Sequence, residues 1–153
     1  MIISFIGHSL VLSKDSVKQQ IKEQMRNNIL GEKSVTCYLG GYGDFDKLCA
    51  ISCKELKQEF ACIETVYVSP YLNIGEQKKI KELLSLGLYD GSVYPPIESV
   101  PLRFAISKRN EWMIEKSDII IAFVNHRYGG AYKSFQMAKR KKKKIINLCD
   151  LTE

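Results

Sequence analysis

The chain has 153 residues, of which 45% are hydrophobic and 26% charged, and its formal net charge is +6. This length suits one domain with a real core and is too short for two ordinary domains, so we expect a single domain over residues 1–153. The composition excludes a disordered chain, and no apolar run approaches the roughly 20 residues of a membrane helix. The N-terminus lacks the charged start and long apolar segment of a signal peptide, so we expect a cytoplasmic protein.

The five cysteines are an odd number in a chain without an export signal, which favours reduced thiols over disulfides. Cys49 and Cys53 are four residues apart, and Leu56 and Phe60 continue the same apolar stripe of a predicted helix. No second pair of Cys or His residues completes a tetrahedral site. We therefore predict no metal site.

Short apolar runs alternate with helical patterns in the first half of the chain. The run from Ile2 to Ile6 shows no alternation, which is typical of a strand buried on both faces. Gly31 ends the first helical pattern, and Pro70 closes the third strand. The elements predicted here are a strand at 2–6, a helix at 15–30, a strand at 35–39, a helix beginning near 44 and a strand at 65–69.

Some 50 residues separate this third strand from the next, which indicates an elaborated crossover. The stretch YDGSVYPPIESVP, residues 89–101, contains three of the four prolines, so it cannot be a central strand or a helix, and we predict an ordered loop. The remaining predicted elements are helices at 76–86, 102–116 and 131–142 and strands at 118–124 and 144–149.

Strands that alternate with helices predict an α/β domain with a parallel sheet of about five strands and helices on both faces. In such sheets, ligands bind beyond the carboxyl ends of the strands. Those ends are Gly7-His8-Ser9, Gly40-Gly41-Tyr42-Gly43, Ser69-Pro70-Tyr71 and residues 125–130. A binding site is therefore expected at this edge.

Two glycine pairs stand between a predicted strand and a predicted helix, in GGYGD (40–44) and YGGAY (128–132). Such a pair lets backbone N–H groups approach an anion at the positive end of a helix dipole, although a plain turn uses glycine too. Neither pair matches a Walker loop or the G-x-G-x-x-G pattern, and we predict no cofactor. Two pairs at one sheet edge favour anion binding.

The segment from 107 to 148 resembles the C-terminal half of the SLOG superfamily of Rossmann-like proteins, which includes DNA-processing protein A, the Lonely Guy phosphoribohydrolases and YpsA-like proteins. Arg109 and Met113 stand where the Lonely Guy helix carries its Arg-Lys-x-x-Met pattern, and Tyr128-Gly129-Gly130-Ala131 occupies their glycine loop. LGGYGDFDKLCA, residues 39–50, is similar to the Gly-Gly-x-x-Gly-x-Asp segment of other branches. The resemblance implies a three-layer Rossmann-like domain.

The resemblance also implies a nucleotide site, with Gly129 and Gly130 around a phosphate, Arg109 paired with it, and Gly40, Gly41 and Asp46 on the ribose side. Gly7, His8 and Asn125 leave strands at the same edge, so we include them as ligand contacts. The structural alternatives are a solvated helix face for Arg109, a first-turn acid that complements the helix dipole for Asp46 and a hydrogen-bonded structural histidine for His8.

The match departs from the phosphoribohydrolases at one catalytic position. Their glutamate corresponds to Ser134, and Gln136 nearby cannot take a proton as a carboxylate does. Asp46, Asp90 and Glu98 are the acids that would substitute, with Asp46 and Glu98 as the leading catalytic candidates. Whether the protein is an enzyme stays open.

The function ranked first is binding of a nucleotide or an ADP-ribose-like derivative. An N-glycosidic hydrolase or transferase acting on nucleoside monophosphates is the first alternative, and single-stranded DNA binding is the second. The basic run KRKKKK, residues 139–144, would hold DNA phosphates in the last case, whereas the simpler interpretation is a solvated helix end. Related folds often form dimers, so a homodimer is also open.

Overall fold

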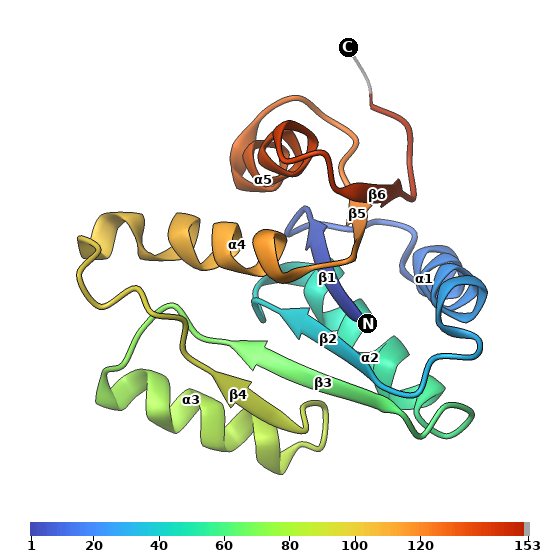
Figure 1. Cartoon of the computed structure of the whole chain (residues 1–153), viewed down its shortest axis with the longest axis horizontal. Helices are drawn as coiled ribbons and strands as arrows, with labels where there is room; N and C mark the ends of the chain where they lie inside the picture. The colour runs from blue at the N-terminus through green and yellow to red at the C-terminus, as the bar shows by residue number, and fades with distance from the viewer. Residues whose placement is uncertain (152–153) are drawn as a thin grey trace.

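The computed structural model describes residues 1–151, and in this range a sheet of six parallel strands is combined with five α-helices (Figure 1). None of these helices is long and apolar enough to cross a bilayer. The elements in chain order are β1 (Ile2–Gly7), α1 (Lys14–Ile29), β2 (Val35–Leu39), α2 (Gly43–Leu56), β3 (Ile63–Val68), α3 (Ile74–Ser85), β4 (Gly91–Val93), α4 (Ala105–Lys116), β5 (Ile119–Phe123), α5 (Gly129–Arg140) and β6 (Lys144–Asn147).

The α/β class and the parallel sheet are confirmed, with one correction to the strand count. The stretch predicted as an ordered loop contains β4, which makes six strands rather than about five. β4 has three residues, occupies the sheet edge and ends just before Pro95 and Pro96. An edge strand is where nearby prolines are tolerated, because its outer side needs no ladder hydrogen bonds. Tyr89 and Ile97, on either side of β4, are buried as apolar anchors.

The strand order in the sheet is β4-β3-β2-β1-β5-β6. β2, β3 and β4 are added in turn on one side of β1, and the chain then crosses back to add β5 and β6 on the other side. The point where the direction reverses lies between β1 and β5, which pair in register from Ile3 with Ile119 to Gly7 with Phe123. The carboxyl ends of strands on either side of this reversal are where doubly wound sheets bind their ligands. The topology therefore indicates a ligand site at the edge of the sheet formed by the carboxyl ends of the strands.

Helices cover the two faces of the sheet in separate groups (Figure 1). The larger apolar cluster joins α1 and α2 to the sheet, and α3 packs against it through Ile80 and Leu83. A second cluster joins α4 and α5 to the opposite face, where Ile114 and Phe135 pack against β5. β1 and β5 lie between the two clusters and are buried on both faces, which explains why both sequences are mostly apolar without alternation.

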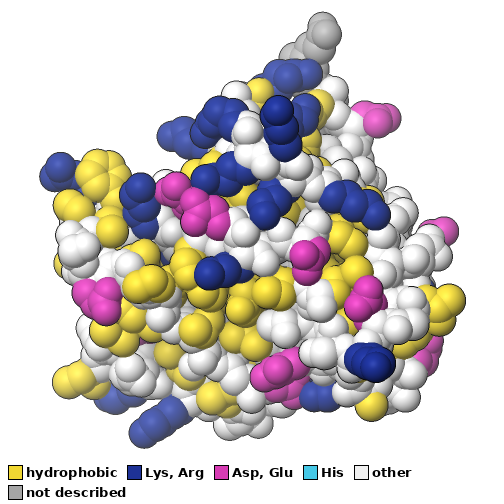
Figure 2. Space-filling model, in the orientation of Figure 1, with side chains coloured by type: hydrophobic (Ala, Val, Ile, Leu, Met, Phe, Trp, Pro, Cys, Tyr) yellow, Lys and Arg dark blue, Asp and Glu magenta, His cyan; other side chains and the backbone are white. Residues whose placement is uncertain are grey.

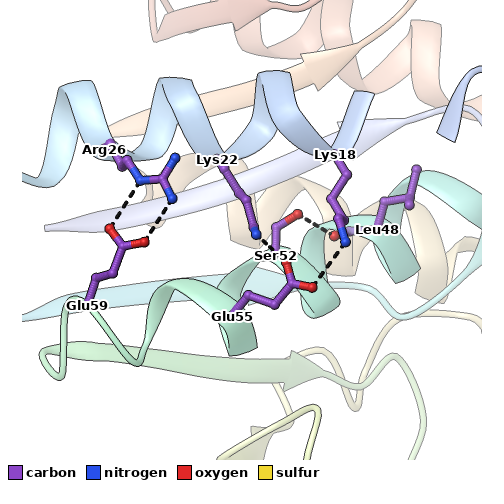
Figure 3. A network of polar contacts seen from close by, with 7 residues as sticks. All are labelled: Lys18, Lys22, Arg26, Leu48, Ser52, Glu55 and Glu59. Atoms are coloured by element: carbon purple, nitrogen blue, oxygen red, sulfur yellow. Dashed lines mark hydrogen bonds and ion pairs between the residues drawn. The ribbon is translucent and has the colours of Figure 1, made fainter. Parts of the chain in front are cut away.

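Charged side chains connect α1 to α2 along their outer side (Figure 3). Glu55 of α2 lies between Lys18 and Lys22 of α1, with 3.0 Å from Lys18 Nζ to Glu55 Oε1. One turn further, Arg26 makes a two-pronged ion pair with Glu59, at 2.8 and 3.2 Å. Bidentate geometry is the stronger form of this interaction, and here it joins α1 to the turn that follows α2.

Candidate functional site

A cleft of about 1180 Å³ opens at the carboxyl ends of the strands. Its walls come from the segments that follow β1, β2, β3 and β5, together with one face of α4 and the start of α5. A smaller pocket of about 310 Å³ lies beside it and shares Pro70 and Tyr71 as a wall. The large cleft is at the edge that the sequence and the strand order both indicate.

The first glycine pair wraps around a carboxylate of the chain itself. Asp46 lies in the first turn of α2, is 9% exposed, and its Oδ2 accepts a hydrogen bond from the backbone N–H of Tyr42 at 3.2 Å. Burial raises the pKa of Asp46 to about 6, against the opposing effects of the Tyr42 N–H, the Arg109 charge and the N–H groups of Gly41 and Gly40. The anion at this turn is therefore Asp46, which itself faces the cleft.

Arg109 of α4 reaches across the ends of two strands. Its Nη1 donates to the carbonyl of Val68 at 2.8 Å and to that of Gly40 at 3.3 Å, and its Nε donates to Asn110 Oδ1 at 2.8 Å. A Cβ at Gly40 would lie 2.9 Å from the guanidinium carbon, so a larger residue here would displace the Arg109 side chain. Burial lowers the pKa of Arg109, and the charge of Asp46 opposes this. Arg109 is thus a fixed charge at the cleft, 4% exposed.

Glu76 brings a second carboxylate to the cleft from the first turn of α3. Its Oε1 accepts the hydroxyl proton of Tyr67 in a short hydrogen bond, and Ser69 Oγ lies 3.0 Å from the same oxygen. Burial first, and then the bond to Glu76, raise the pKa of Tyr67, so the phenol keeps its proton. The carboxylate is consequently held in one orientation, with a side-chain exposure of 8%.

Three aromatic rings stack along another wall of the cleft. The rings of His8 and His126 are 3.6 Å apart and nearly parallel, and Tyr128 continues the stack at 3.9 Å. His8 Nε2 accepts a hydrogen bond from the backbone N–H of Asn125, and His126 Nδ1 donates to Asn125 Oδ1. Burial, followed by the neighbouring charge of His126, lowers the pKa of His8. The lowered pKa favours the neutral form of His8, which holds the Asn125 backbone in place. The same side chain also lines the cleft.

The second glycine pair begins α5 and faces the cleft directly. Gly129 has φ +87°, a backbone conformation that favours glycine, and no heavy atom lies within 4 Å of where a Cβ would be at Gly130. No side chain in the described part of the molecule caps this helix. The first N–H groups of a helix need acceptors, and the residues that begin α5, Gly129, Gly130 and Ala131, line the cleft at the positive end of the helix dipole.

Ser134, which corresponds to the phosphoribohydrolase glutamate, and Gln136, two residues later, lie in different surroundings. Ser134 is buried against the cleft, where Asn110 Nδ2 is 3.4 Å from its hydroxyl oxygen. Gln136 is exposed, and its amide donates to the hydroxyl of Tyr132 at 3.2 Å. Neither residue supplies a carboxylate to this wall of the cleft.

The cleft brings together most of the residues that the sequence indicates. Eight of them line it, namely Gly7, His8, Gly40, Asp46, Arg109, Asn125, Gly129 and Gly130. Gly41 is not part of the wall, because Tyr67 covers it and its N–H serves Asp46. Glu98 is exposed beside the smaller pocket. Asp90 accepts the N–H of Thr65 and pairs with Lys57, away from the cleft.

The basic run 139–144 lies at the far end of α5 from the glycine pair. Figure 2 shows Lys and Arg side chains gathered over the part of the surface that α5 and the end of the chain occupy. Lys141 pairs with Glu115 at 2.8 Å, and Lys143 Nζ donates to the carbonyls of Glu115 and Ser117. Part of the run therefore fastens the turn after α5 to the end of α4.

Glu76 is a carboxylate of the cleft that our interpretation of the sequence did not name as a site residue, although a signal for the helix start is present. Asn73 and Glu76 are three residues apart in the segment that follows β3, and this is the spacing of a helix start. Asn73 Oδ1 does accept the N–H of Glu76 at 2.8 Å, so α3 begins at Ile74. The Glu76 side chain turns inward to Tyr67 instead of reaching back to the cap.

The parallel sheet, its strand order and the cleft at its reversal point define a Rossmann-like α/β protein. Its fold is similar to that of DNA processing protein A from Helicobacter pylori, described for its single-stranded DNA binding mode, with a TM-score of 0.63 and 15% sequence identity. The similarity covers 99% of this chain and 68% of that one. No protein-family model and no curated protein matches the sequence. At this identity, the similarity shows the fold alone.

Proposed function

We propose that the large cleft binds a nucleotide, with its phosphate at the N-terminus of α5. The observation that carries this proposal is the uncapped helix start at Gly129 and Gly130, which faces a cleft at the reversal point of the sheet. Backbone N–H groups at such a start bind phosphate without a cationic side chain. The volume of about 1180 Å³ accommodates a base, a sugar and a phosphate together.

The contrast between the two glycine pairs supports this assignment. The N–H groups of the first pair are directed to Asp46, whereas the described structure places no carboxylate side chain at the second. The anion that completes the second pair would therefore come from a ligand. Together with the sequence resemblance, this arrangement leads us to propose that the chain is a member of the SLOG superfamily.

A charge placed at the helix start tests the proposal without disturbing the fold. The space beside Gly130 accommodates the side chain of Gly130→Asp. An acid in the first turn of α5 interacts favourably with the helix dipole, so we expect the folding stability of the variant to be maintained or raised. The same carboxylate would occupy the phosphate position and repel a phosphate. We expect calorimetric titration with nucleoside monophosphates to show binding to the wild type and at least tenfold weaker binding to Gly130→Asp.

The matched control is Ser107→Asp, which introduces the same residue at an exposed position in the first turn of α4, outside the wall of the cleft. We expect this variant to bind like the wild type. The proposal is wrong if no nucleoside monophosphate binds the wild type, or if both variants bind equally well. Release of free base from a bound nucleotide, lost in Asp46→Asn, would support the N-glycosidic alternative instead.

Single-stranded DNA binding is the second candidate, favoured by the fold similarity to DNA processing protein A. Neutralising Lys141 or Lys143 would also break contacts to α4, so a cleaner variant is Arg140→Gln with Lys142→Asn. Lys142 has φ +56°, which asparagine tolerates. DNA binding through this surface predicts weaker retention of oligonucleotides by the double variant and a shallower salt dependence. Unchanged retention would exclude residues 140 and 142 as DNA contacts.

A further inference from the structure

One donor and one acceptor are fixed in the cleft with no partner in the described part of the chain. Arg109 uses Nε and Nη1 for hydrogen bonds to the protein, and its other terminal nitrogen, Nη2, makes none within residues 1–151. Glu76 uses Oε1 for Tyr67 and Ser69, and its Oε2 has no hydrogen-bond partner in the same range. Both side chains are more than nine-tenths buried.

Both of these atoms reach open space. Within residues 1–151, no side-chain nitrogen or oxygen of Arg109 or Glu76 is fully buried without a hydrogen-bond partner. Nη2 of Arg109 and Oε2 of Glu76 are therefore accessible, and the open space that both residues line is the large cleft. The charge of Glu76 acts on Arg109, yet no ion pair within 4.0 Å joins the two groups in the described structure.

A ligand group that fills this gap must accept a hydrogen bond from Arg109 and donate one to Glu76. A hydroxyl does both, because it has one proton and two lone pairs. An ionised phosphate has no proton for the carboxylate, and an ammonium group has no lone pair for the guanidinium. The pair therefore favours a hydroxyl over a phosphate oxygen or an ammonium group.

We propose that Arg109 and Glu76 hold a ribose hydroxyl of the bound nucleotide, so that the cleft selects ribonucleotides over the corresponding deoxynucleotides. This inference rests on the proposed function and extends it to the sugar. Its placement fits the topology, since Arg109 spans the ends of β2 and β3, Glu76 follows β3, and the phosphate position follows β5 on the other side of β1. The nucleotide would then lie across the end of β1.

The preference for a ribose hydroxyl depends on the fixed orientation of the Arg109 and Glu76 side chains. The two carbonyls fix the guanidinium, and Tyr67 and Ser69 fix the carboxylate, so neither charge is free to turn toward another partner. A ligand that lacks the hydroxyl leaves both buried groups unpaired. Loss of a hydrogen bond to a charged partner weakens binding by about 10- to 100-fold.

The test compares nucleoside 5′-monophosphates with their 2′-deoxy and 3′-deoxy forms by calorimetric titration of the wild type. We expect at least one deoxy form of the best-bound nucleotide to bind about tenfold more weakly or worse. Equal affinity for all three forms overturns the inference but leaves the proposed function standing. Absence of binding by every form overturns both.

A variant isolates the contribution of the carboxylate. Glu76→Gln keeps an oxygen for Tyr67 and replaces the free oxygen by an amide that donates, so the hydroxyl loses its acceptor. We expect this variant to bind the ribonucleotide and its deoxy form with similar, weak affinity. The control is Glu82→Gln, an exposed residue of the same helix, which should keep the wild-type preference. A wild-type preference in Glu76→Gln would contradict the assignment.

Discussion

The carboxylate of Asp46 accepts a hydrogen bond at 3.2 Å from the backbone N–H of Tyr42, four residues earlier in the chain. This contact closes the Gly40-Gly41 turn around a side chain of the protein. The turn at Gly129-Gly130, which has a similar sequence, encloses no such carboxylate in the described structure. Two motifs that look equivalent in sequence therefore have different roles at the cleft.

Asp46 makes a pH-dependent contribution to stability. Its pKa is raised from the ordinary value of 3.8 to about 6 on folding, so the folded state binds the proton more tightly. The contribution is fully present below pH 3.8 and is lost as the pH rises through 6. We expect the unfolding free energy of the wild type to fall by about 3 kcal/mol, relative to Asp46→Asn, over this interval.

Urea unfolding at several pH values measures this difference. Asp46→Asn is the reference, because it removes the titration while it keeps one oxygen for the backbone N–H groups. A difference between the two proteins that stays constant from pH 4 to 6.5 would show that Asp46 has an ordinary pKa. Carboxyl chemical shifts recorded over the same range give an independent reading of the same titration.

His8 makes a contribution of opposite sign. Its pKa is lowered by burial and by His126, so its contribution is present above pH 6.5 and is lost as the pH falls below that value. His8→Gln keeps an acceptor for the N–H of Asn125 and cannot take a proton. We expect the stability of this variant to depend less on pH between 5 and 6.5 than that of the wild type. An imidazole titration of His8 above 6.5, seen by NMR, would contradict this.

Arg109→Ala should destabilise the fold in addition to any effect on binding. The substitution leaves the carbonyls of Gly40 and Val68 without their donor, and such losses in a buried charged network cost about 2–5 kcal/mol. Chemical denaturation measures the effect, with Lys108→Ala on the exposed side of α4 as a control within about 0.5 kcal/mol of the wild type. A fully stable Arg109→Ala protein would show that the strand ends do not depend on the guanidinium.

Glu55→Gln tests the ion pairs between α1 and α2. Hydrogen bonds from Lys22 and Lys18 lower the pKa of Glu55, so its contribution is present above the ordinary carboxyl pKa and is lost as the pH falls. Glu55 is 39% exposed, and we expect a loss of less than about 1 kcal/mol that decreases further at high salt. A loss of several kcal/mol, or one independent of salt, would mean that packing and not charge dominates this contact.

The central strands were predictable because a strand that is buried on both faces requires apolar residues at nearly every position. Residues 2–6 are apolar except for Ser4, and residues 119–124 are all apolar; these runs correspond to β1 and β5 at the centre of the sheet. β4 was not predictable in this way, since its three residues, Gly91–Val93, lie at the sheet edge and include a single apolar side chain. Its position is decided by pairing with β3, which is a tertiary effect.

The cleft was predictable in position and less so in detail. Strand ends are visible in sequence, and they placed Gly7, Gly40, Asn125 and Gly130 at one edge. The sequence does not show which hydrogen-bond donors already have partners within the protein. The hydrogen bonds of Arg109, for example, join residues that are 41 and 69 positions apart in the chain. For the same reason, the sequence did not show that Glu76 turns to Tyr67.

The most direct test of the proposed nucleotide site follows the backbone amides themselves. In ¹⁵N-labelled protein titrated with nucleoside monophosphates, we expect the amide signals of Gly129, Gly130 and Ala131 to show the largest shifts, with saturation at a single affinity. Signals of residues 139–144 should move little. Largest shifts at residues 139–144, or no saturable shift at the start of α5, would contradict the account.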